Sequence, residues 1–520
     1  MVLWARAELG AAGSVARLRD AERLRRYRQL QDFYEGRHFD RPRNGRSNLV
    51  LNYARTIVDK GIAYLLGRGL SFDVPPRDEA DPASRELAQR AEGLLYDIYW
   101  DNDLDAVDLQ VAQNAGVLGD GVYKVFYDPI GERIRVVNVD PFCFFARWAA
   151  DDPNDLRQVE VAYSLSPEDL AGGISSWMLG PGESALFEIP KGAGGLNGSG
   201  GTADPRASVE VVERWTATEL SLTFGERVVR RGPNPYGFIP FVHVPNLQPA
   251  NQSWGVSDLV DVIPINRELN ERVSDQADVI RYHADPPIVF KGVTEHTDLA
   301  VGPGTVWDVP VDSDVKLLEW QGQPIAVGEH IERILRTLYE IAETPRTAFG
   351  DSGRVLSGVA LEAELRPLIQ KTLRRRVFWT RALRTRNRLM LRLAERYGVD
   401  GAQPGDFAPY RSRVIWPPMV PRDDAAEVRN NVALVSAGLR SYRGALDALG
   451  VESPEEELRR IVADRERLGE PAVAGAAPAP RPVMDASAAP NGRPLGFIRP
   501  RSGAGAGASS GMPAGAADIC

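Results

Sequence analysis

Cysteine and histidine are both scarce in this chain. Its 520 residues include 2 cysteines, Cys143 and Cys520, and 5 histidines. Two cysteines so far apart are too few for a disulfide framework or a thiolate metal site. The histidines are scattered, with no HExxH motif and no carboxylate cluster beside them. The sequence therefore predicts no metal site and no cofactor.

Long apolar runs and the common catalytic motifs are also missing. No apolar run approaches the roughly 18 residues needed to cross a bilayer, so we expect no membrane helix. Charges occupy the first eight residues, where a signal peptide would be apolar, which favours an intracellular site of synthesis. We find neither a phosphate-binding P-loop motif nor a GxSxG nucleophile elbow, and expect no enzyme.

The composition is that of a globular protein, with 43% hydrophobic and 26% charged residues. A chain of 520 residues exceeds what one core usually organises, so we expect two to four subdomains. Its net charge of −9 argues against a uniformly positive surface that coats nucleic acid. Any contact with DNA should therefore be local.

The first half of the chain combines helical and strand patterns. Apolar spacings of three and four residues predict helices over 15–36 and 48–67, and a pair of helices over 85–118. From residue 121 the period changes to two, which predicts a β-hairpin over 122–139 and further short strands behind it. Residues 1 to about 250 should form one α+β unit.

The next part of the chain reads as helix, strands and helix. A long helix is expected over 256–283 with Pro264 near its start, strands and turns over 286–323, and a helix from Pro324 to Glu343. This order implies a helical hairpin with a small β module at its tip. Acidic residues outnumber basic ones on the first helix, so one face should be negative, although an ordinary solvated face is the simpler alternative. The acidic residues are Asp258, Asp261, Glu268, Glu271, Asp275 and Asp278.

A glycine-rich polar loop over 346–358 separates this helix from a strongly basic one. A loop held between two rigid helices, with arginines and no catalytic triad nearby, suits contact with a polyanion better than chemistry. Arg346 and Arg354 lie on this loop.

The basic pattern spans residues 359–397, and Glu395 is the only acid between Arg366 and Arg396. Pro367 is expected to break or bend this helix. Its cations could bind phosphates or pair with acidic surfaces of a neighbouring subunit, and we favour the pairing slightly. A strand over 411–418 and helices over 422–469 should follow. Residues 470–520 are rich in Ala, Pro, Gly and Ser, which predicts a disordered tail.

Several short motifs occur in a characteristic order between about residues 25 and 400. Because of these motifs and their order, the chain resembles the portal, or head-to-tail connector, proteins of tailed double-stranded DNA bacteriophages. The resemblance is to the type of portal protein named after a siphophage of Bacillus. The motifs are Phe33-Tyr-Glu-Gly36, Asn48-Leu-Val-Leu-Asn52, Ile57-Val-Asp-Lys-Gly-Ile-Ala-Tyr-Leu-Leu-Gly67, Pro240-Phe-Val-His-Val-Pro-Asn246, Gly255-Val-Ser-Asp-Leu259 and Ser357-Gly-Val-Ala-Leu361.

The resemblance implies a portal fold of the α+β class, divided along the chain. Its expected parts are a wing over 1–255, stem helices over 256–285 and 324–345, a clip over 286–323, a tunnel loop over 346–358, a long basic helix with a return to the wing over 359–421, a helical crown over 422–469 and the tail over 470–520.

The same resemblance implies a ring of about twelve identical subunits at one capsid vertex. Such a ring is made in the host cytoplasm, becomes part of the virion, and passes double-stranded DNA during packaging and ejection. An acidic stem lining would repel phosphates while the loops touch the backbone transiently. Five side chains of the tunnel loop are expected to face the channel: Arg346, Asp351, Ser352, Arg354 and Ser357. The implied partners are the terminase large subunit, the major capsid and scaffold proteins and the head-tail adaptor, with no membrane.

Two alternatives stay open on the residues alone. One is a metal-dependent nuclease or hydrolase in which Asp351, or Asp258 with Asp261, holds a metal. The other is a ring-forming scaffold of a gene-transfer or secretion apparatus that moves no phage genome.

Overall fold

The computed structural model describes most of the chain in two compact units, residues 1–421 and 422–520. Among the described residues, no helix is both long and apolar enough to cross a membrane. The described residues are 15–39, 47–67, 69–165, 209–225, 227–284, 288–291, 314–317, 324–350, 358–419, 424–449, 451 and 454–468. The expected tail over 470–520 lies outside them.

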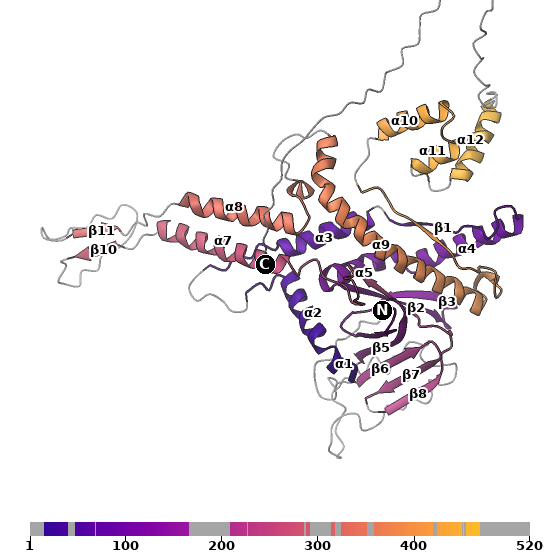
Figure 1. Ribbon diagram of the computed structural model, residues 1–520, viewed down its shortest axis with the longest axis horizontal. Helices are drawn as coiled ribbons and strands as arrows, with labels where there is room; N and C mark the ends of the chain where they lie inside the picture. Colours follow the sequence, from indigo (N-terminus) through magenta and orange to yellow (C-terminus); the bar gives the residue numbers. More distant parts are fainter. Residues whose placement is uncertain are drawn as a thin grey trace, which may run out of the picture. The chain divides into compact units, whose positions relative to one another are not determined.

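Two antiparallel sheets of three and five strands form most of the β structure described in the first unit, as the alternating pattern predicts (Figure 1). The smaller sheet has the order β3-β2-β9, and β2 is its central strand. It consists of β2 Asp120–Asp128, β3 Arg133–Asn138 and β9 Phe241–Pro245. The larger sheet follows chain order, with β4 Phe144–Trp148, β5 Leu156–Leu165, β6 Val209–Thr216, β7 Glu219–Phe224 and β8 Arg227–Pro233.

Helices cover the smaller sheet, and α5 and α9 both pack on β2. Buried residues of these helices and both sheets join in one hydrophobic cluster. The helices are α1 Val15–Arg19, α2 Ala21–Tyr34, α3 Tyr53–Leu66, α4 Pro82–Asp101, α5 Leu104–Leu118 and α9 Gly358–Tyr397. A third pairing joins β1 Ser71–Asp73 to β12 Arg413–Ile415. The mixed helix and sheet content agrees with the expected α+β class.

The second unit is helical over its described residues. It contains α10 Asp424–Ser436, α11 Tyr442–Ala448 and α12 Pro454–Leu468, and α11 packs against both other helices.

A helical hairpin extends from the first unit, as the sequence predicts. Helices α7 Val262–Ala284 and α8 Pro324–Ile341 lie side by side, and the antiparallel pair β10 Ile288–Lys291 and β11 Asp314–Leu317 lies at their far end (Figure 1).

Two expected helix starts are wrong, and one expected break is absent. Helix α7 begins at Val262 rather than residue 256, because the Ser257 hydroxyl accepts the Leu259 N–H and holds a turn there. Helix α3 begins at Tyr53 rather than residue 48, with Asn52 as its N-cap. Helix α9 continues through Pro367, so that proline does not break it.

The segment before α3 is extended because α7 holds its backbone. Polar side chains spaced four residues apart share one face of a helix. Each of four such side chains accepts one backbone N–H at 2.9–3.0 Å: Asn266 from Ala54, Asn270 from Leu51, Ser274 from Leu49 and Asp278 from Ser47. This polar ladder explains why the Asn48–Asn52 motif does not continue the helix.

His38 joins the polar ladder to the end of α2. The Asn270 oxygen is used by Leu51, so the amide nitrogen donates to His38 Nδ1 at 2.6 Å. His38 Nε2 then donates to the Phe33 carbonyl at 2.8 Å, and the imidazole stacks on the Phe33 ring. Burial lowers the pKa of His38 below its usual value; the Phe33 carbonyl opposes this, while Arg267 adds to it. Folding therefore favours the neutral imidazole.

Removal of the Asn270 amide tests the polar ladder. The substitution Asn270→Ala leaves the Leu51 N–H and His38 without their partners, and should lower the free energy of unfolding by about 2–4 kcal/mol in a urea titration. Gln276→Ala, at a half-buried position of the same helix outside the ladder, should cost less than about 1 kcal/mol. Equal costs would contradict the ladder's role.

His38 also predicts the pH dependence of stability. Because the folded state lowers its pKa below 6.5, the unfolded chain binds a proton more readily. The free energy of unfolding should therefore fall as the pH drops below 6.5. In urea titrations across this window His38→Gln should reduce the slope, whereas His330→Gln, at an exposed position of α8, should keep it. An unchanged slope in His38→Gln would refute this assignment.

Candidate functional site

The junction between α8 and α9 holds the glycine-rich loop that the sequence marks for DNA contact. A short 3-10 helix, η2 Arg346–Phe349, follows α8, and Gly350 takes a left-handed backbone conformation after it. Arg346 is exposed, and its guanidinium lies 3.8 Å from the Glu332 carboxylate of α8. The other predicted loop residues, Asp351, Ser352, Arg354 and Ser357, lie outside the described residues.

The start of this loop is tied to α9. Arg374 donates to both carboxylate oxygens of Glu343, at 2.6 and 2.7 Å. Lys371 Nζ donates to the Ala342 carbonyl at 3.1 Å. A small cluster of Ala348 with residues of α9 adds apolar contact. These contacts of Ala342, Glu343 and Ala348 hold the start of the loop in place, and we call them the loop base.

A cavity of about 560 Å³ lies beside this base, between α8, the start of α3 and the first turns of α9. Aromatic and aliphatic side chains line it together with charges of both signs. The lining residues are Tyr53, Glu332, Leu335, Arg336, Tyr339, Glu340, Glu343, Pro345, Arg346 and Pro367.

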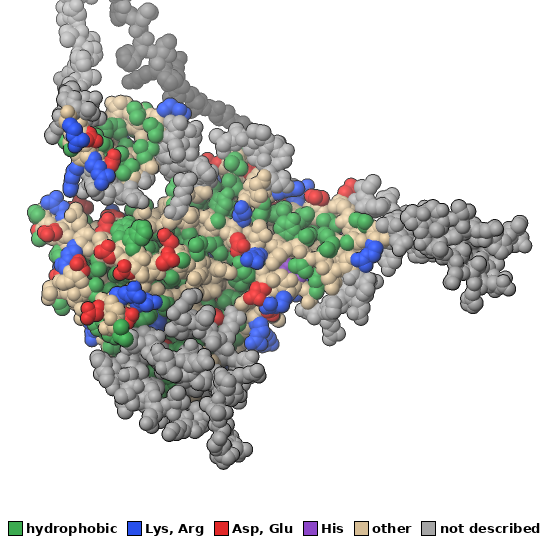
Figure 2. Space-filling model, turned by 180° about the vertical axis from the view of Figure 1, so that it is seen from behind, with side chains coloured by type: hydrophobic (Ala, Val, Ile, Leu, Met, Phe, Trp, Pro, Cys, Tyr) green, Lys and Arg blue, Asp and Glu red, His purple; other side chains and the backbone are tan. Residues whose placement is uncertain are grey.

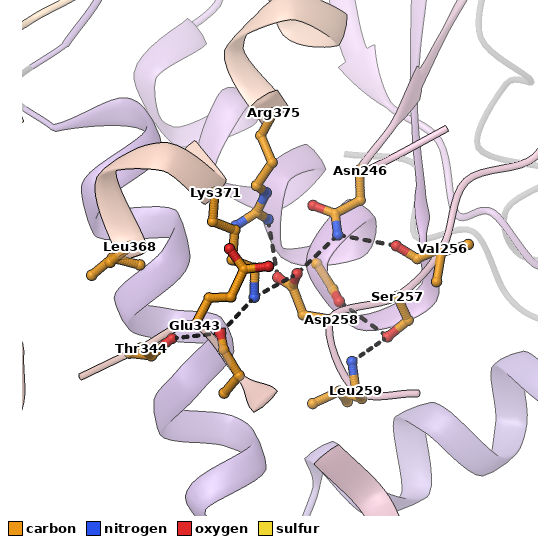
Figure 3. Close-up of polar contacts among 12 residues, drawn as sticks. Asn246, Val256, Ser257, Asp258, Leu259, Glu343, Thr344, Leu368, Lys371 and Arg375 are labelled. Carbon is orange, nitrogen blue, oxygen red and sulfur yellow. Dashed lines mark hydrogen bonds and ion pairs between the residues drawn. The ribbon is translucent and has the colours of Figure 1, made fainter. Parts of the chain in front are cut away.

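Asp258 forms the polar centre behind the loop base (Figure 3). Its side chain is 1% exposed, and its carboxylate lies 3.2 Å from Lys371 Nζ and 3.2 Å from Arg375 Nη2. The Asn246 amide donates a third contact at 3.1 Å. Burial alone would raise the pKa of Asp258, but Arg375 and Lys371 outweigh it and lower the pKa below its usual value.

Two glycines make room for the Arg375 guanidinium. A Cβ at Gly61 of α3 would lie 2.7 Å from Arg375 Nη1, and one at Gly116 of α5 would lie 2.9 Å from Val58. The backbone N–H of Asp258 also donates to the Gly116 carbonyl at 3.0 Å. The Gly61 and Asp258 positions of the sequence motifs are thus parts of one buried arrangement.

The expectation that Asp258 lines a channel is wrong, because its side chain is buried and ion-paired. Asp261 is exposed but precedes α7. The remaining predicted acids lie on α7 and are half-buried: Glu268, Glu271, Asp275 and Asp278.

The acidic face of α7 is also partly neutralised within the chain. Arg272 contacts Glu268 at 2.6 Å and Asp275 at 3.2 Å. Asp278 accepts the Ser47 N–H. The face therefore carries less free negative charge than a count of its residues indicates.

Much of the basic pattern of α9 is internal, which sequence reasoning missed. Arg375 and Lys371 face Asp258, and Arg386 contacts Asp108 of α5 at 2.5 Å. Burial opposes the charge of Arg386, but Asp108 raises its pKa. Arg376 donates to backbone carbonyls at the end of α3, and burial lowers its pKa to about 10. Apolar residues spaced between these cations were the available signal for a buried face.

A metal site finds no support among the described residues. None of their His, Cys, Asp and Glu side chains form a group of three or more suited to a metal ion. Asp258 is paired with two cations, so its carboxylate is unsuited to bind a third. On the face seen in Figure 2, basic and acidic side chains are interspersed.

The fold and the fixed loop base define an α+β protein with a projecting helical hairpin. A family model described as "Phage portal protein, SPP1 Gp6-like" matches residues 18–168 and 208–470, and the chain therefore belongs to this family of phage portal proteins. No curated protein matches the chain. The chain is thus a portal protein of a tailed phage that acts in DNA packaging, and it is a component of the virion.

The Asp258 contacts predict unequal effects of one substitution at two nearby positions. Asp258→Asn leaves Lys371 and Arg375 buried without a counter-charge, and should lower the free energy of unfolding by about 3–5 kcal/mol. Asp261→Asn changes an exposed side chain and should stay within about 0.5 kcal/mol of wild type. Urea titrations of both variants measure the difference, and similar values would contradict the role given to Asp258.

Proposed function

We propose that this portal protein forms a closed ring of about twelve copies with an axial DNA channel at one capsid vertex. The observation that carries the proposal is the family match over most of the chain, which includes the α7–α8 hairpin and the α8–α9 junction. A subunit that uses two different surfaces toward its two neighbours closes into a ring when the rotation between copies permits it.

The parts of the chain have distinct proposed roles. Residues 1–255 act as the wing, and helices α7 and α8 act as the stem. The segment between them, which contains β10 and β11, acts as the clip that meets the terminase large subunit and later the head-tail adaptor. The second unit contributes the crown, and the ring's outer surface meets the major capsid and scaffold proteins.

The loop over 346–358 is proposed to face the channel. Its base is held by the Glu343–Arg374 and Ala342–Lys371 contacts, which fix where the loop leaves the protein. Lysine and arginine neutralise phosphates without reading sequence, which suits packaging of any genome. Arg346 and Arg354 would supply these contacts. The half-buried acids of α7, such as Glu271, would repel the DNA elsewhere.

The assembly is tested by the mass and shape of the purified protein. Native mass determination with negative-stain imaging should give particles of about twelve copies with a central hole. A protein that stays monomeric or dimeric across a salt series would contradict the ring.

The loop makes a separate prediction. Arg354→Glu should lower the DNA packaged in a terminase-driven assay several-fold, because each subunit then repels the phosphate backbone. The ring should still form. Arg411→Glu, the same change at an exposed position outside the loop, should package as wild type does. Unchanged packaging by Arg354→Glu would remove this residue from the account.

A further inference from the structure

An exposed tryptophan surrounded by acids lies where α4 meets α5. Trp100 is 83% exposed and Leu109 is 50% exposed. Asp97 and Asp101 lie within one turn of Trp100 on α4, and Asp105 lies about one turn before Leu109 on α5. All three aspartates are exposed, and none forms an ion pair among the described residues. A tryptophan this exposed is uncommon on a folded monomer and is a frequent anchor of protein interfaces. We name this surface the acidic corner.

The outer face of α9 carries the opposite character. Leu373 is 51% exposed and Val377 is 67% exposed. Arg384 and Arg388 continue the same face, seven residues after Val377 and four residues after that, and both are exposed without an ion pair among the described residues. These four side chains combine apolar area with positive charge. We name them the basic stripe.

The two surfaces point away from each other. Arg386 of α9 faces α4 and α5, where it contacts Tyr99 and Asp108. Arg384 and Arg388 lie two positions to either side of Arg386, which is a turn of about 200°, so they point away from α4 and α5. On α4, Asp97 and Asp101 are likewise two positions from Tyr99 and point away from α9. The acidic corner therefore cannot reach the basic stripe of its own chain.

We propose that the acidic corner of one copy docks on the basic stripe of the next copy. This inference rests on the proposed ring, in which each subunit must present two different and complementary surfaces. Trp100 would pack on Leu373 and Val377, while the aspartates pair with Arg384 and Arg388, which lie farther along the same face of α9. The interface would therefore combine apolar contact with charge pairs, as protein interfaces commonly do.

DNA is the competing occupant of the basic stripe. Phosphates would neutralise Arg384 and Arg388, but they would leave Leu373 and Val377 exposed. A second copy covers both kinds of side chain and also covers Trp100. The observations therefore favour the protein partner.

Charge reversal of each surface tests the proposal with the full chain. Arg384→Glu with Arg388→Glu, or Asp97→Lys with Asp101→Lys, should each raise the protein concentration for half-maximal ring assembly about tenfold at low salt. All four changes together restore opposite charges and should bring this concentration back near wild type. Single-particle mass measurements over a dilution series give these values. Trp100→Ser should also weaken assembly, with little dependence on salt.

Matched controls separate this interface from folding and from bulk charge. Arg25→Glu with Arg28→Glu makes the same charge change at exposed positions of α2 and should assemble as wild type does. Melting temperatures should be unchanged, because every altered side chain is exposed. Wild-type assembly by both reversal pairs, or no recovery on combining them, would overturn the proposal. Normal rings with reduced DNA binding would assign the stripe to DNA instead. A monomeric wild type would contradict the proposed ring itself.

Discussion

The buried carboxylate of Asp258 is the contact on which the other elements depend. It precedes α7 and binds Lys371 and Arg375 of α9, while Lys371 also reaches the Ala342 carbonyl at the end of α8. Three elements that are separate in sequence are thereby held at one place. A buried ion set is costly unless every charge is matched, so these elements are fixed in one arrangement rather than several. These contacts therefore also fix the position at which the loop between α8 and α9 begins.

The long helix α9 serves the fold more than its composition suggests. Its inner cations match Asp258 and Asp108, and room for the Arg375 guanidinium comes from Gly61. Of its outer cations, Arg384 and Arg388 form no ion pair among the described residues. Although its sequence is strongly basic, the helix has an inner and an outer basic face. Residues two positions apart point to opposite sides of a helix, which separates the two faces. The acidic face of α7 is divided in the same way, with the polar ladder on one side and half-buried acids on the other.

The sequence predicted the positions of helices and strands better than it predicted which charged side chains are buried or paired. Periodicity predicted the helices around Asp101, the β2–β3 hairpin and the α7–α8 hairpin, because apolar spacing reports which face is buried. Periodicity placed Asp258 on a helix, and the family resemblance placed it in a channel, since neither shows which charges find a partner far along the chain. The start of α3 was misplaced for a related reason: the extended backbone before it is held by α7 side chains more than 200 residues away. Arg346 is the one predicted loop residue that the structure describes; it is exposed, and its contact with DNA stays a prediction.

The proposed function connects the loop base, whose position is fixed by α9, with the DNA channel expected of a portal protein. Its central claim is that the α8–α9 junction surrounds the axis of a ring and contacts passing DNA. Electron cryomicroscopy of the purified assembly tests this claim most directly. The account predicts a closed ring in which residues 346–358 of every subunit form the narrowest part of the channel. A closed ring with this junction on its outer surface, or an assembly without an axial channel, would contradict it.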